Sequence, residues 1–306
     1  MQNSKLQFKS QNFSPEDLKK LYIPASDSHK GQNGKLMIIG GSKLFHAASL
    51  WSLKIASRIV DMTFYSSIPE NNEIVAQAKK EFRDGIVVPR NRIEDYISET
   101  DCVLIGPGLT RKSGEEEGDD DTKELTERLL QKYPEKKWVI DGGSLQTINP
   151  EIIPENAIIT PHQGEFKTLV KNVILSEREE SRSFADAQDD KISNAQDDKL
   201  EEQVSEFAKE HNCVILLKGE KDIVASPNEL VEISGGNAGM TKGGTGDVLA
   251  GLVAALYCKN DAFLAAKCAS YINKKAGESL AKKVGLYFNS SDLVDEIPKV
   301  MKELIL

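Results

Sequence analysis

The sequence predicts a three-layer α/β/α sandwich around a mostly parallel central sheet. From Lys35 onward, short runs that are apolar at nearly every position alternate with longer segments of helical periodicity. Strands that are apolar throughout, rather than at alternate positions, are typical of a parallel sheet buried on both faces. After Thr245 this alternation gives way to successive helical segments. Strand–helix alternation of this kind is typical of layered α/β proteins.

The apolar runs set the expected elements. We expect strands at 36–41, 62–67, 85–88, 102–108, 138–143, 157–161, 213–219 and 222–226. Helices are expected near 47–60, 122–133, 163–173 and 199–211, and then at 246–258, 261–282 and 291–304. No Pro-, Gly- or Ser-rich linker separates two cores, so we expect a single domain over 1–306 with an N-terminal extension at 1–27.

Two acidic segments interrupt the alternation. Residues 113–121 (SGEEEGDDD) hold six acids and no base. Residues 176–203 contain AQDDK twice and hold ten acids against four bases. The second segment has few large apolar side chains and can bury little surface on folding. We interpret both as acidic insertions, the second a low-complexity one grown by duplication; a docking or regulatory role for it is the alternative.

These insertions account for the acidity of the chain. The 306 residues carry 39 Lys+Arg and 48 Asp+Glu, a formal net charge of −9. Outside the two insertions the charge is about +3, so the body is near neutral. Nucleic acids and anionic membranes call for a strongly basic surface, and we expect neither as a partner. A near-neutral body does suit a pocket for anionic small molecules.

Cysteine usage and hydropathy predict a cytoplasmic protein. The four cysteines have no metal-site or redox spacing, and we expect buried, reduced thiols: Cys102, Cys213, Cys258 and Cys268. The first twenty residues lack the apolar core of a signal peptide. The longest apolar stretch, 248–257, is far shorter than the ~20 residues of a transmembrane helix.

The strongest chemical motif is NAGMTKGGTGDVLAGLVAAL at 237–256. Gly243, Gly244 and Gly246 favour a tight turn that a ligand can approach closely. The helix that follows directs free N–H groups and its positive dipole end onto this turn, which makes an anion site. Asp247 at its mouth could remove a proton from a hydroxyl that attacks phosphorus. Alternatively, Asp247 only caps the helix.

Three further glycine- or proline-containing loops follow predicted strands. They read GGSKLFHAASL, IGPGLT and TPHQGEF, beginning at residues 40, 105 and 160. The carboxyl ends of strands in open parallel sheets are where ligands bind, so the four loops are expected to share one site. GxxxxGK[ST] is absent, and no GxGxxG follows the first predicted strand.

Together these motifs resemble the ribokinase-like superfamily and, within it, the NAD(P)H-hydrate dehydratase family. The similarity covers about 28–298, and the opening SHKG…GGS with the TPHxGEF loop makes it specific. The matching segments are SHKGQNGKLMIIGGS (28–42), IGPGL (105–109), ITPHQGEF (159–166), LKG (217–219), GNAGMTKGGTGDVLAG (236–251) and SDLVDEIP (291–298). The resemblance implies a ribokinase-like fold.

The resemblance also implies a role for individual residues. The general base of the family corresponds to Asp247. The adenine-nucleotide site corresponds to Lys218, Gly219, Glu220, Lys221, Asp222, Asn237, Gly244, Thr245 and Gly246. The site for the hydrated nicotinamide corresponds to Ala48, Gly106, Gly108, His162 and Asp247.

The implied reaction is a hydro-lyase reaction of metabolite repair. ADP or ATP, with Mg²⁺, phosphorylates the C6 hydroxyl of (6S)-NADHX or (6S)-NADPHX, the hydrated cofactors. Loss of phosphate then regenerates NADH or NADPH. A ribokinase-like small-molecule kinase and a non-catalytic nucleotide-binding relative are the alternatives. The family likeness also implies a homo-oligomer, and the short stretch before SHKG leads us to expect a separate NAD(P)HX epimerase as functional partner.

Several side chains keep two interpretations. His162 opens a helix, so its imidazole is either a helix cap or a contact to the substrate. Glu165 and Glu278 could bind Mg²⁺ through water or could be ordinary helix residues, and we assign no metal site. Asp222 stands where the family usually has a threonine. Its carboxylate would repel phosphates unless Lys218, Lys221 or a metal compensates for the charge.

Overall fold

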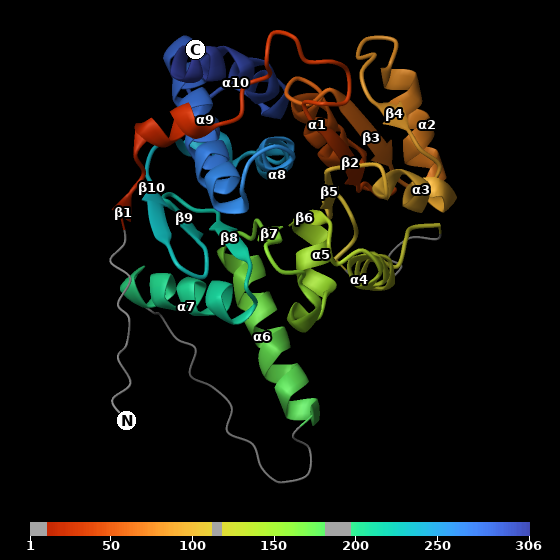
Figure 1. The fold of residues 1–306 in the computed structure, drawn as a ribbon, viewed down its shortest axis with the longest axis vertical. Helices are drawn as coiled ribbons and strands as arrows, with labels where there is room; N and C mark the ends of the chain where they lie inside the picture. Colours follow the sequence, from red (N-terminus) through yellow and green to blue (C-terminus); the bar gives the residue numbers. More distant parts are fainter. Residues whose placement is uncertain (1–10, 112–117, 181–196) are drawn as a thin grey trace.

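The computed structural model describes residues 11–111, 118–180 and 197–306. Within these ranges the strands are β1 (Gln11–Asn12), β2 (Lys35–Ile39), β3 (Met62–Ser66), β4 (Ile86–Val87), β5 (Cys102–Ile105), β6 (Lys137–Ile140), β7 (Ile158–Ile159), β8 (Val214–Leu217), β9 (Asp222–Ala225) and β10 (Leu230–Ile233). They form one sheet in the order β1-β10-β9-β8-β7-β6-β5-β2-β3-β4 (Figure 1). β9 is antiparallel to β8 and β10, and the other neighbouring pairs are parallel. The mostly parallel sheet is confirmed.

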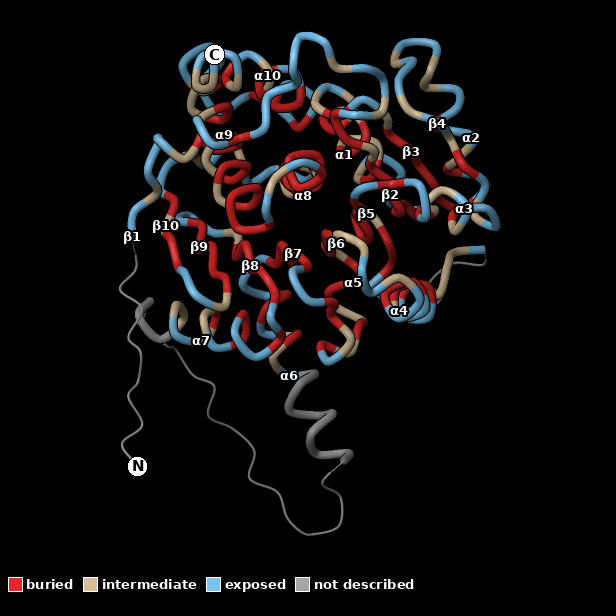
Figure 2. The backbone as a smooth tube through the Cα atoms, in the orientation of Figure 1, coloured by how far each residue is buried: buried red, intermediate tan, exposed pale blue. Residues whose placement is uncertain are grey.

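Helices cover both faces of the sheet, as the alternation predicted. They are α1 (His46–Ala56), α2 (Pro69–Ala78), α3 (Ile93–Ile97), α4 (Thr122–Lys132), α5 (Gly142–Thr147), α6 (Gln163–Glu180), α7 (Asp197–Glu210), α8 (Thr245–Tyr257), α9 (Ala262–Val284) and α10 (Ser290–Ile305). Successive residues of a strand point to opposite faces. Accordingly, Leu36 and Ile38 lie in the core between one face of the sheet and helices α1, α8, α9 and α10 (Figures 1 and 2). Met37 and Ile39 lie in the core between the other face and helices α3 to α7.

The differences from the predicted elements have local causes. β1 is an edge strand of two exposed residues, and β10 is a short strand that pairs with β1 on one side and forms a hairpin with β9 on the other. α5 (GGSLQT) begins with two glycines, and α2 (PENNEIVAQA) is mostly polar, so neither carries a strong helical signal. α6 reaches Glu180, beyond the expected end at 173. Residues 113–117 of the first acidic insertion and 181–196 of the second lie outside the described residues.

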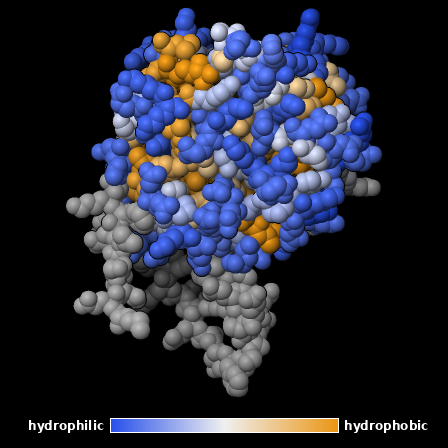
Figure 3. Space-filling model, viewed as in Figure 1, coloured by the Kyte–Doolittle hydropathy of each residue, from blue (hydrophilic) through white to orange (hydrophobic). Residues whose placement is uncertain are grey.

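The apolar material lies inside the molecule. α8 is buried over nearly its whole length between α1, α9 and the sheet (Figure 2). All four cysteines are free and buried, as predicted. Polar residues cover most of the face seen in Figure 3, and hydrophobic residues form separate patches on it. Among the described residues, every helix is too short or too polar to cross a lipid bilayer.

The order of the strands predicts where a ligand binds on the sheet. β2 lies between β3 and β5, so the chain leaves β2 toward one edge of the sheet and later returns to build the other side. Ligands of open α/β sheets bind at such a reversal, outside the carboxyl ends of the strands. The loops after β2 and β5 are the GGS and GPG segments of the sequence motifs.

Candidate active site

The loops after β2 and β5 pack directly on each other. The Gly41 amide donates to the Pro107 carbonyl oxygen at 2.8 Å. Gly106 has φ +120°, and a Cβ there would overlap the Asp141 carbonyl oxygen, so only glycine fits. A Cβ on Gly108 would lie 2.9 Å from the Cβ of Ala48 on α1. The structure therefore brings together Ala48, Gly106 and Gly108, three of the residues predicted to contact the substrate.

The first turn of α8 is the predicted anion site. Gly244 is the N-cap residue with φ +95°, and a Cβ there would collide with the Trp51 ring. Ser290 Oγ donates to the Gly243 carbonyl oxygen at 2.8 Å, and Thr245 Oγ1 donates to the Met240 carbonyl oxygen at 2.6 Å. The turn is thus fixed from three directions. Its free backbone N–H groups and the positive end of the helix dipole can receive an anion.

Asp247 lies on this turn and is held against α1. Ser52 Oγ donates to the Asp247 backbone carbonyl at 2.7 Å, one turn from Ala48. Burial and the nearby Asp141 carboxylate raise the pKa of Asp247 to about 7, although Lys218 opposes the rise. A carboxylate with this pKa takes up and releases a proton near neutral pH. This pKa suits a general base, and the N-cap residue of α8 is Gly244 instead of Asp247.

Lys218 and Asp141 form an ion pair beside Asp247. Lys218 Nζ lies 2.8 Å from Asp141 Oδ1, which also accepts a 2.7 Å hydrogen bond from Thr160 Oγ1. A Cβ on Gly246 would lie 3.5 Å from the same Nζ, so the ammonium group is at the first turn of α8. Burial lowers the pKa of Lys218, but the Asp141 and Glu165 carboxylates outweigh it and the pKa is raised. The site keeps a positive charge where phosphate is expected.

His162 and Glu165 cap α6 reciprocally. His162 Nδ1 accepts hydrogen bonds from the Gly164 and Glu165 amides at 2.9 and 3.2 Å, and Glu165 Oε2 accepts one from the His162 amide at 2.9 Å. In a neutral ring the proton therefore sits on Nε2. The backbone of His162 pairs with that of Lys218, next to the ion pair. His162 is a helix cap, its ring is about half exposed, and its Nε2 lies 3.6 Å from Glu165 Oε1.

Asp222 differs from its expected surroundings. It is buried, and its Oδ1 accepts a 2.9 Å hydrogen bond from the Gly219 amide. The cation beside its carboxylate is Lys274 of α9 at 3.3 Å, whereas Lys218, one of the two lysines considered from the sequence, pairs with Asp141. Lys221 instead lies 3.4 Å from Glu232 on β10. Sequence reasoning missed Lys274 because nothing in the local motif points to a helix about fifty residues away.

The other predicted nucleotide residues border the same region. Glu220 is exposed on the turn between β8 and β9. Asn237 caps the 3-10 helix Ala238–Thr241 and donates to the Gly277 carbonyl oxygen at 2.8 Å. The structure thus gives Asn237 a structural task in the loop that precedes the glycine turn of α8.

The two acids weighed for Mg²⁺ are already engaged. Glu165 also accepts a hydrogen bond from Gln146, and Glu278 accepts from the Gly236 amide and pairs with Lys275. In the part of the chain that the structure describes, no group of three or more His, Cys, Asp or Glu could hold a metal ion.

The end of the first acidic insertion is tied to the site loops. Asp119 accepts a 2.9 Å hydrogen bond from the Lys43 amide, directly after the GGS loop. Asp120 pairs with Arg90 at 2.7 Å, and Asp121 caps α4. Asp119 therefore contacts the GGS loop, which the interpretation as an insertion outside the motifs did not foresee.

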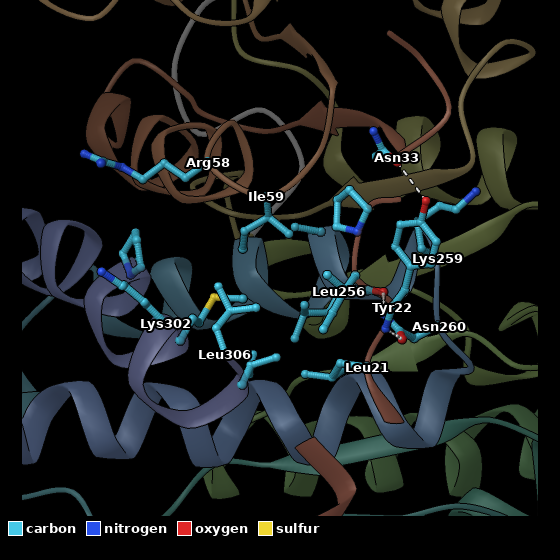
Figure 4. Close-up of a pocket in the computed structure, with 16 residues that line it drawn as sticks. Leu21, Tyr22, Asn33, Arg58, Ile59, Leu256, Lys259, Asn260, Lys302 and Leu306 are labelled. Atoms are coloured by element: carbon cyan, nitrogen blue, oxygen red, sulfur yellow. Dashed lines mark hydrogen bonds between the residues drawn. The ribbon is translucent and has the colours of Figure 1, made fainter. Parts of the chain in front are cut away.

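A separate apolar cavity lies away from these loops. Its volume is about 300 Å³, and it is formed by the segment 21–24 and the C-terminal ends of α1, α8 and α10 (Figure 4). Tyr22 OH donates to Asn33 Oδ1 on its rim. None of its lining residues belongs to the predicted site.

Comparison with known proteins decides the family. The family model described as NAD(P)H-hydrate dehydratase matches residues 36–299. The chain belongs to the NAD(P)H-hydrate dehydratase family. The match spans every loop of the site described above, from the GGS segment to the first turn of α8.

Two archaeal relatives illustrate the range of architectures in this family. The ADP-dependent (S)-NAD(P)H-hydrate dehydratase of Nitrosopumilus maritimus is 33% identical over 303 residues, covering 93% of this chain and 95% of the relative. The bifunctional NAD(P)H-hydrate repair enzyme of Methanocaldococcus jannaschii is 36% identical over 294 residues. That match covers 94% of this chain but only 52% of the relative, so the chain spans about half the length of such bifunctional proteins.

Solved structures support the fold of this dehydratase-family member. A ribokinase-like superfamily protein of Enterococcus faecalis superposes with a TM-score of 0.76 at 20% identity, covering 100% of this chain and 99% of that chain. The ADP/ATP-dependent NAD(P)H-hydrate dehydratase of Bacillus subtilis, co-crystallized with ATP/Mg²⁺, gives 0.72 at 20% identity, covering 98% and 99%. The ribokinase-like fold predicted from the motifs is confirmed.

Proposed function

We propose that this chain is an enzyme that dehydrates (6S)-NADHX or (6S)-NADPHX back to NADH or NADPH, with ADP or ATP as phosphoryl donor. The observation that carries the proposal is Asp247, a carboxylate with a pKa of about 7 on the first turn of α8, beside the Lys218 ammonium. A base and an anion site side by side are what phosphoryl transfer to a hydroxyl requires.

In the first half-reaction a phosphoryl group moves from the nucleotide to the substrate. Asp247 accepts the proton of the C6 hydroxyl while the hydroxyl oxygen bonds to the terminal phosphorus of the nucleotide. The bond from that phosphorus to the rest of the nucleotide breaks. The turn at Gly244–Gly246 and Lys218 stabilise the transferred charge. Gly106, Gly108 and Ala48 shape the surface against which the nicotinamide half would lie.

The second half-reaction is driven by the substrate itself. Phosphate is a better leaving group than hydroxide, and the ring nitrogen supplies the electron pair as the C6–O bond breaks. The C5 proton then passes to the released phosphate or to water, and the electrons of the C5–H bond form the C5–C6 double bond of the dihydronicotinamide. Asp247, protonated in the first step, can return its proton to the departing phosphate, which resets the base.

Mg²⁺ fits this site as a companion of the nucleotide. In proteins Mg²⁺ is commonly held by substrate phosphates, waters and one or two carboxylates. Glu165, Glu278 and Asp141 are engaged in other contacts and Asp247 is the proposed base, so we propose phosphate oxygens and water as the main ligands of the ion. When bound, the ion would neutralise phosphate charge.

Homo-oligomer formation and a separate NAD(P)HX epimerase as functional partner remain predictions from the sequence.

A turnover assay tests the proposal. Purified protein is mixed with (6S)-NADHX and either ADP or ATP, and both near-ultraviolet absorbance of reduced nicotinamide and inorganic phosphate are followed. We expect both to rise together with at least one nucleotide. A stable phosphorylated alcohol without recovered absorbance would instead establish a kinase. Nucleotide binding with no conversion would establish a binding protein.

A further inference from the structure

One face of α9 supports two separate loops of the proposed nucleotide site. Ser270, Lys274, Gly277 and Glu278 recur at the spacing that places residues on one side of a helix. These residues contact the turn 218–222 and the loop 235–237. Both segments contain residues that we assign to the adenine nucleotide. α9 itself contributes none of the predicted site residues.

Lys274 is the central contact on this face. Its ammonium is buried and donates to the carbonyl oxygens of Glu220, Gly219 and Gly235 at 2.9, 3.2 and 3.5 Å. The first two belong to the turn after β8, and the third belongs to the loop after β10. One side chain therefore bridges two loops that are distant in sequence.

Asp222 connects the turn 218–222 to Lys274 and Ser270 of α9. Its Oδ1 accepts from the Gly219 amide and lies 3.3 Å from Lys274 Nζ, while its Oδ2 accepts a 2.7 Å hydrogen bond from Ser270 Oγ. Both charged side chains are more than nine-tenths buried. A buried lysine is costly unless its donors and its charge are satisfied, and here three carbonyls and a carboxylate satisfy them.

From these contacts we infer that Lys274 is a positioning residue of the adenine-nucleotide site. It holds the turn 218–222 and the loop 235–237 at a fixed separation before the nucleotide arrives. Pre-organised loops lose less conformational freedom on binding, so the effect falls on nucleotide affinity. The phosphoryl-transfer step depends on Asp247 and Lys218 instead. The inference rests on the proposed function, because it takes these loops to be the nucleotide site.

Nucleotide binding is the direct test. The dissociation constant of ADP is measured by titration calorimetry, without substrate, for wild type and Lys274→Met, and turnover is measured at saturating ADP. We expect affinity to fall about tenfold or more, which corresponds to about 1.4 kcal/mol, with kcat nearly unchanged. Lys302→Met, which removes an exposed lysine of α10, is the matched control and should bind as wild type does.

A double variant separates positioning from simple charge neutralisation. Lys274→Met leaves Asp222 buried without its cation, which can itself destabilise the protein. In Asp222→Asn/Lys274→Met that charge is gone, so the melting temperature should recover. ADP affinity should stay low, because the bridge between the loops is still missing. Recovery of wild-type affinity in the double variant would overturn the positioning role.

The binding measurement also distinguishes the two proposals. If wild type binds ADP but does not convert the hydrate, the proposed function fails and the role of Lys274 in binding can still be upheld. If wild type turns over and Lys274→Met binds ADP equally well, the inference about Lys274 fails alone. Wild type that binds neither ADP nor ATP would overturn both.

Discussion

Lys218 at the end of β8 reaches Asp141 at the end of β6, with 2.8 Å between Nζ and Oδ1. The two residues lie on opposite sides of β7, and Thr160, directly after β7, donates to the same Asp141 oxygen. This contact gives the site a cation and an anion that act on Asp247 in opposite directions. Burial is the largest cause of the raised pKa of Asp247, and the two charges adjust that pKa further.

Replacing Asp247 tests the base directly. Asp247→Asn keeps the shape of the side chain but cannot accept a proton. We expect kcat to fall by about 10²–10⁴-fold, the usual contribution of a general base. ADP affinity, measured by calorimetry, should change little. Turnover that survives the substitution undiminished would show that the proton goes elsewhere.

The pH dependence of the reaction should follow Asp247. The base must be ionised, so kcat/KM should fall as pH drops below the pKa of about 7. Lys218 lowers this pKa and Asp141 raises it. Lys218→Met should therefore move the acidic limb of the pH–rate profile to higher pH, and Asp141→Asn should move it to lower pH. Shifts of both variants in the same direction would contradict this account.

Two neighbouring glycines provide a matched test of the anion site. Gly244 has φ +95°, and a Cβ there would meet the Trp51 ring, whereas a Cβ on Gly243 would have no heavy atom within 4 Å. Gly244→Ala should cost about 1–3 kcal/mol of unfolding free energy and most of the activity. Gly243→Ala should stay within about 0.5 kcal/mol of wild type. Denaturant unfolding and the turnover assay measure both effects.

The site shows why some features could be predicted from sequence and others could not. Gly106, Gly108 and Gly244 are recognisable because a backbone conformation and a close approach require glycine in the linear motif itself. The strands are recognisable because burial on both faces makes them apolar throughout. Lys274 and Ser52 act through tertiary contacts, and neither has a local signature. The contacts of Asp119 and Asp120 were hidden because an acidic run resembles a solvated surface.

The buried carboxylate of Glu296 on α10 should make the stability of the folded protein depend on pH in the acidic range. Burial raises its pKa, but Lys283, Ser279 and Lys299 outweigh this and lower it to about 2. A pKa lower in the folded state than in the unfolded chain adds stability above the unfolded pKa of about 4.3. That contribution should be lost as pH falls from about 5 toward 2.

Glu296→Gln should remove this contribution. Hydrogen bonds to a charged group are worth about 1.5–3 kcal/mol. We therefore expect the free energy of unfolding of the variant at pH 7, measured by denaturant unfolding, to be lower than that of wild type by this amount. The gap to wild type should narrow as pH falls toward 2, since protonation takes the same charge from wild type. Glu303→Gln, an exposed acid on the same helix, is the control and should track wild type at every pH. An equal gap at pH 7 and near pH 2 would assign the loss to altered packing instead of to the carboxylate charge.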